Sequence, residues 1–154
     1  MANGYFREDQ SHRLGRLLDE TKERGLFRLV MLHHPPVRGA VTTHKRLLGI
    51  ARFQSVIQRH GADLILHGHS HVPSKYAIRG ADGTVPVIGV AAAGQAPGGD
   101  KPAAQYNMFE IAGEPGNWSV AMKRRGLTGL STPVTTLATE VLVEGTPEQA
   151  LAKN

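Results

Sequence analysis

The sequence contains no cysteine, which excludes disulfide bonds, thiolate metal sites and a cysteine nucleophile. Any metal must therefore be bound through nitrogen or oxygen atoms. No apolar run approaches the roughly 20 residues of a membrane-spanning helix, and residues 1–13 lack the apolar segment of a secretory signal peptide. Aromatic residues are few, and no basic segment has aromatic side chains interleaved with its charges. These absences predict a soluble, cytoplasmic protein and disfavour membranes and nucleic acid as partners.

The chain has 154 residues, which suits one domain with a hydrophobic core that needs neither disulfides nor a structural metal. Lysine and arginine number 18 against 13 aspartate and glutamate residues, so the formal net charge is +5. This balance favours anionic ligands, including phosphates.

Helices and strands alternate in the first half of the chain. Residues 8–25 and 45–61 have the apolar spacing of amphipathic helices, and each segment ends in a glycine that would terminate the helix. Residues 26–32 read as a buried strand that stops before two prolines, and 63–71 as a short strand that runs into a loop. Strand, helix and strand form a βαβ unit, whose crossover favours a parallel strand pair.

After residue 75 the pattern is typical of antiparallel hairpins. Two strand pairs are expected, 75–80 with 84–93 and 105–112 with 118–126. A loop rich in glycine and proline joins the hairpins. Residues 131–154 have weak periodicity and many threonines, which predicts a weakly structured C-terminal tail.

Histidines follow both strands of the βαβ unit. His33 begins the motif HHPP, whose prolines stiffen the loop, and His69 and His71 lie in GHSH. In an extended backbone, side chains two residues apart project to the same face, and Gly68 lets the loop approach an ion closely. An isolated H-x-H motif is more often a surface pair. Two histidine motifs at the carboxyl ends of neighbouring parallel strands, where α/β sheets place their ligands, predict a metal site.

The segments VMLHHPP and LILHGHSH, in this order and separated by one helix, resemble the last two motifs of the calcineurin-like metallophosphoesterase family. That family has a four-layer α/β/β/α sandwich and hydrolyses phosphomonoesters or phosphodiesters with two metal ions, commonly iron, manganese or zinc. The resemblance covers residues 5–125. It implies an α/β fold that is the C-terminal portion of such a sandwich, with a partial metallophosphoesterase domain at residues 1–130.

The resemblance also assigns roles to the histidines. His33 and His69 would bind one metal ion and His71 the other. His34 would lie behind these ligands or contact the phosphate, which makes it the candidate catalytic residue. His67 has no assigned family role and is expected to be a strand-end residue that is hydrogen-bonded within the core.

The family's upstream motifs are absent, namely D-x-H, GD-x-x-D with its bridging aspartate, and GNH-[DE] with its general acid. The closest segments lie downstream and carry Ala103 and Trp118 where the second acid and the histidine belong. The chain is therefore expected to be a fragment or a truncated reading frame. A two-metal mechanism needs a bridging carboxylate to hold the ions about 3.5–4 Å apart, whereas three histidines can hold one zinc-like ion with an open position.

Three functions remain open. The first is a metal-dependent phosphoesterase that uses a metal-bound hydroxide, with His34, His44 or Lys45 replacing the general acid. Its substrate would be a small phosphoester, nucleotides included. The second is a catalytically silent metal-binding fragment, and the third is a metal-independent anion-binding module.

Arg38, Arg46 and Lys45 could contact a phosphate, although solvated surface charge is the commoner role. An uncovered sheet edge would also favour self-association.

Overall fold

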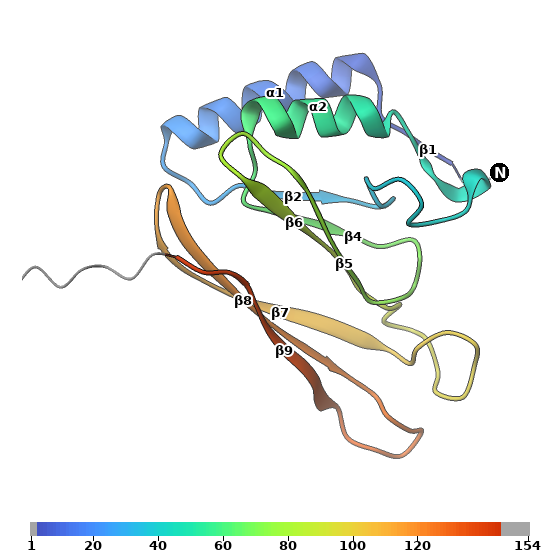
Figure 1. Cartoon of the computed structure of the whole chain (residues 1–154). Helices are drawn as coiled ribbons and strands as arrows, with labels where there is room; N and C mark the ends of the chain where they lie inside the picture. The colour runs from blue at the N-terminus through green and yellow to red at the C-terminus, as the bar shows by residue number, and fades with distance from the viewer. Residues whose placement is uncertain (1–2, 146–154) are drawn as a thin grey trace, which may run out of the picture.

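A computed structural model describes residues 3–145, except for the side chain of His44. Two helices cover one face of a mixed sheet, and an antiparallel sheet lies on its other side (Figure 1). The helices are α1 (Glu8–Glu23) and α2 (Ile50–His60), with a short 3-10 turn at Thr43–Lys45. The strands are β1 (Gly4–Tyr5), β2 (Leu29–Leu32), β3 (Leu47–Leu48), β4 (Leu64–His67), β5 (Ser74–Arg79), β6 (Thr84–Gly89), β7 (Gln105–Glu114), β8 (Asn117–Gly126) and β9 (Thr135–Val143).

The mixed sheet has the strand order β2-β4-β6-β5. Strand β2 pairs in parallel with β4, and β4 with β6, while β5 and β6 form an antiparallel hairpin. The βαβ unit and the first hairpin are therefore confirmed. The main core lies between this sheet and the helices, where Phe53, Ile57, Ile65 and Val87 are almost completely buried.

Two details of the βαβ unit differ from the prediction. Helix α2 begins at Ile50 rather than at residue 45, because Gly49 adopts a φ of +97° at its start. The segment 26–32 is not a buried strand, since Leu29 and Met31 on β2 are 43% and 74% exposed. Strand β2 is at the edge of the sheet, and the antiparallel sheet packs against the neighbouring β4 and β6 instead.

The second sheet has the order β7-β8-β9, with all strands antiparallel. Strands β7 and β8 confirm the second predicted hairpin. The expectation of a weakly structured tail is wrong for residues 135–143, which form β9 along β8. Threonine and valine in this segment favour extended backbone, and the free edge of β8 supplies the hydrogen-bonding partner. Residues 146–154 of the expected tail lie outside the described residues.

The described residues thus form a mixed α/β fold with one helical layer, two larger sheets and a small parallel sheet of β1 and β3. The four-layer sandwich stays a prediction. No helix in the described part of the chain is both long and apolar enough to cross a membrane.

Candidate metal centre

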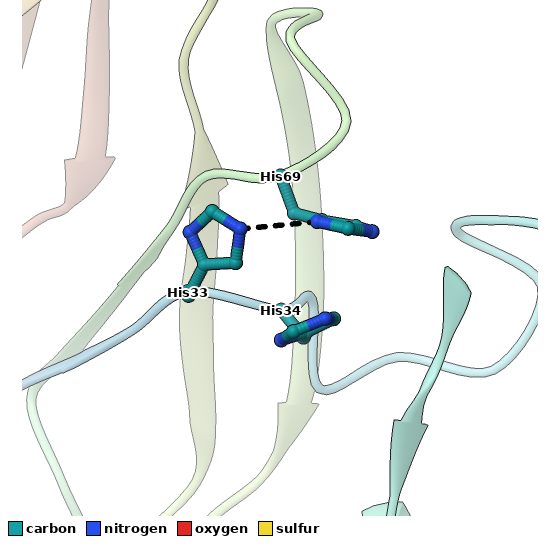
Figure 2. Close-up of side chains that lie close together, drawn as sticks. All are labelled: His33, His34 and His69. Carbon is teal, nitrogen blue, oxygen red and sulfur yellow. Dashed lines mark hydrogen bonds between the residues drawn. The ribbon is translucent and has the colours of Figure 1, made fainter. Parts of the chain in front are cut away.

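The two histidine motifs meet because β2 and β4 end side by side. Leu32 pairs with His67 in the parallel register, and the next residues continue the pairing, since the Gly68 N–H donates to the His33 carbonyl oxygen at 3.0 Å. The chain therefore leaves both strands at the same edge of the sheet. This position brings His33 and His34 from one loop against His69 from the other (Figure 2).

Three imidazoles form a compact cluster at this edge. His33 Nε2 lies 3.0 Å from His69 Nδ1, and the ring centroid of His34 lies 4.2 Å from that of His69. One nitrogen from each of the three rings lies within 4.8 Å of the others. Two nitrogens on one tetrahedral zinc-like ion lie about 3.4 Å apart, given a bond of about 2.1 Å. The rings therefore need to approach one another by up to about 1.4 Å to bind a common ion.

The loop that carries His69 has an unusual backbone. His69 and His71 have φ angles of +65° and +57°, a left-handed conformation that costs roughly 1–2 kcal/mol per residue other than glycine. The Ser70 N–H donates to the Gly68 carbonyl oxygen at 2.8 Å, and Lys101 Nζ donates to the Ser70 carbonyl oxygen at 2.7 Å. These contacts hold the strained turn. Such strain is concentrated at functional sites in proteins.

The left-handed turn separates the two histidines of GHSH. The expected extended backbone is wrong, so His69 enters the cluster, whereas His71 is exposed and outside it. The role of His71 at a second ion stays a prediction. His34, which was expected behind the ligands, supplies the third nitrogen of the cluster.

The electrostatics of the cluster favour neutral imidazole at His69. Burial lowers the pKa of His69, and the positive charges of His34, His33, Lys45 and His71 lower it further. Neutral imidazole is the form that binds metal. In addition, Nε2 of His69 is buried and has no hydrogen-bond partner among the described residues. A buried nitrogen without a partner is costly, and it is not the nitrogen that faces His33, since His69 Nδ1 is the atom 3.0 Å from His33 Nε2.

Sequence reasoning missed two residues that shape the cluster. Gly4 of β1 lies directly against the His34 ring, so that a Cβ at this position would come within 2.8 Å of the ring Cε1. Lys101 reaches the turn from the loop between β6 and β7. No local motif marks either residue, because both contacts are long-range.

His67 has a structural role, as expected. Its side chain is 5% exposed, its Nδ1–H donates to the Gly68 carbonyl oxygen at 3.1 Å, and its Nε2 accepts from the Ser74 hydroxyl at 3.2 Å. Burial lowers the pKa of His67. The neutral ring with both nitrogens paired anchors the end of β4.

The cluster has no carboxylate among the described residues. The side chain of His44, one candidate general acid, is outside the described residues. The described site is therefore an all-nitrogen centre.

Comparison with known proteins gives a likeness of fold. No family model matches the chain, and no curated protein matches it. A solved structure, a dimetal phosphatase from Danio rerio, matches with a TM-score of 0.53 and 15% sequence identity over 86% of this chain. The chain spans 39% of that protein. The fold is thus similar to part of a dimetal phosphatase.

Proposed function

We propose that the chain is a metal-dependent phosphoesterase module whose metal is held by His33, His34 and His69. The observation that carries this proposal is the convergence of three imidazoles from two adjacent strand ends. The 3.0 Å separation of His33 Nε2 and His69 Nδ1 supports it. The similarity of the fold to part of a dimetal phosphatase supports the reaction class.

The donor set bears on the metal. Imidazole suits zinc and iron, whereas manganese prefers carboxylate and water. Among the metals that the resemblance implies, we therefore propose zinc or iron for this cluster. A second ion at His71 belongs to the proposal too, with ligands beyond those in the cluster. A bound ion supplies Lewis acidity, which activates water and polarises a phosphoryl oxygen.

The protein groups around the cluster have defined tasks in this proposal. The neutral His69 and its neighbour His33 hold the ion, and the strained turn fixes the ring of His69. Lys45 is close enough to lower the pKa of His69, so its ammonium group lies where it would attract an anionic phosphoester. The proposed substrate is a small phosphoester, nucleotides included, and the absence of cysteine supports a cytoplasmic location.

A second candidate is a catalytically silent metal-binding protein. The all-histidine cluster favours it, because a carboxylate that could bridge two ions is missing from the described site. Only turnover separates the two candidates.

The test is hydrolysis of bis(p-nitrophenyl) phosphate by the purified chain with zinc, iron or manganese. The proposal predicts turnover that is abolished by a chelator and by His69→Ala. His12→Ala is the matched control, because His12 is an exposed histidine on α1 away from the cluster. Metal bound without turnover would favour the silent alternative. Turnover that survives His69→Ala would contradict the proposed centre.

A further inference from the structure

A cavity of about 350 Å³ lies between the loop after the HHPP motif and the start of α2. Its volume is in the usual range for small-molecule sites, about 300–1,000 Å³. Its floor is apolar, with Val37, Leu47 and Ile50 among the lining residues, and its rim carries Arg38 and Arg46. None of the histidines of the metal centre lines it.

Arg38 and Arg46 have no counter-charge within residues 3–145. Both are exposed, and neither forms an ion pair or side-chain hydrogen bond with a described residue. No acidic residue is among the described residues that line the cavity. By contrast, Arg28 is paired with Asp63 at 3.1 Å. Each guanidinium group presents a planar donor fork that fits phosphate or carboxylate.

The walls of the cavity are fixed by the fold. Pro36 is fully buried, and its carbonyl oxygen accepts from Gln54 Nε2 at 2.9 Å, which ties the loop to α2. The Lys45 N–H donates to the Thr42 carbonyl oxygen at 2.9 Å. On the opposite wall, α2 begins at Gly49 without a capping side chain or an acidic residue in its first turn. The arginines therefore flank a built hollow.

The cavity adjoins the metal centre. Leu47 lines it and also lines a neighbouring cavity, whose walls include His33 and His34. Arg38 follows His34 by four residues, so their Cα atoms are at most about 14 Å apart. A small molecule with two anionic groups can span this separation.

We propose that the cavity lined by Arg38 and Arg46 binds an anionic group, and that it is the subsite for a second phosphate or carboxylate of the phosphoester substrate. The second part rests on the proposed function. The apolar floor accepts the body of the molecule between its two anionic groups.

The cavity is tested by binding of inorganic phosphate to the full chain, with a chelator present and at about pH 8, where imidazoles are neutral. Isothermal titration is expected to show phosphate affinity reduced about tenfold by Arg38→Gln and by Arg46→Gln. Arg16→Gln removes the same charge from an exposed, unpaired arginine on α1 and is expected to leave affinity unchanged. Equal weakening by all three variants, or none by the first two, would overturn the proposal.

The subsite role is tested with the p-nitrophenyl ester of thymidine 5′-phosphate, with and without a 3′-phosphate. Arg38→Gln and Arg46→Gln are expected to raise KM about tenfold for the substrate with the extra phosphate only. Equal effects on both substrates would overturn the subsite role. If no variant or wild-type sample turns over while phosphate binding behaves as expected, the proposed function and the subsite role fail and the anion cavity stands.

Discussion

Substitution of Gly4 by alanine tests whether the position of the His34 ring matters for metal binding. A Cβ at residue 4 would press against Nδ1 of that ring, which would be nearer than Cε1 at 2.8 Å, whereas ordinary contact begins at 3.4 Å, so the ring must retreat by about 1 Å. Gly4 and His34 both border a cavity of about 360 Å³, which gives the ring room to move. We therefore expect about 1 kcal/mol of lost stability, at the low end of the usual cost of overpacking.

The expected effect on metal affinity is larger. Substitution of a residue that supports a metal ligand typically weakens metal binding by about 10- to 100-fold. Gly4 is such a residue, because it lies against the ring of His34. The assay is competitive zinc titration of wild type and Gly4→Ala, with urea unfolding of the metal-free proteins alongside. Gly94→Ala is the control, because a Cβ there meets nothing within 4 Å. Wild-type zinc affinity in a folded Gly4→Ala protein would refute the role assigned to His34.

Three further predictions concern the turn, the core histidine and the sheet edge. Lys101→Met removes the hydrogen bond to the Ser70 carbonyl oxygen, so amide hydrogen exchange in residues 68–72 should accelerate while exchange in α1 stays unchanged; equal rates would contradict the tie. Because burial lowers the pKa of His67, the unfolded chain binds its proton first, and stability should fall as pH drops below about 6.5. Urea titrations should show a weaker pH dependence for His67→Gln, and an identical dependence would contradict this reasoning. Wild-type protein is expected to associate as its concentration rises in sedimentation experiments, and Met31→Lys, which places a charge on the exposed face of β2, should reduce that association; a wild-type chain that stays monomeric would contradict this prediction.

The elements of the fold could be predicted where local signals agree. The helical spacing of apolar residues and the terminating glycines identify the βαβ unit, and the turn residues between paired strands identify both hairpins. The exposure of Met31 could not be predicted, because an apolar strand reads the same at an edge as in the interior. Strand β9 was missed, since a threonine-rich segment becomes a strand only when a neighbouring strand pairs with it.

The same division holds for the metal centre. The meeting of His33 with His69 follows from parallel pairing, because the two strands end at one edge of the sheet. The outward position of His71 does not follow from its spacing, since it depends on two left-handed residues in the turn. The contact between Gly4 and His34 is also long-range, and glycine there carries no local signature.

The most direct test of the central claim is X-ray absorption spectroscopy of the purified chain loaded with zinc. The proposed centre predicts at least one bound ion with three imidazole nitrogens at about 2.0–2.1 Å. The His69→Ala protein should lose that imidazole signal, and His12→Ala should keep it. An ion coordinated without imidazole, or a spectrum unchanged by His69→Ala, would contradict the assignment of His33, His34 and His69 as the metal ligands.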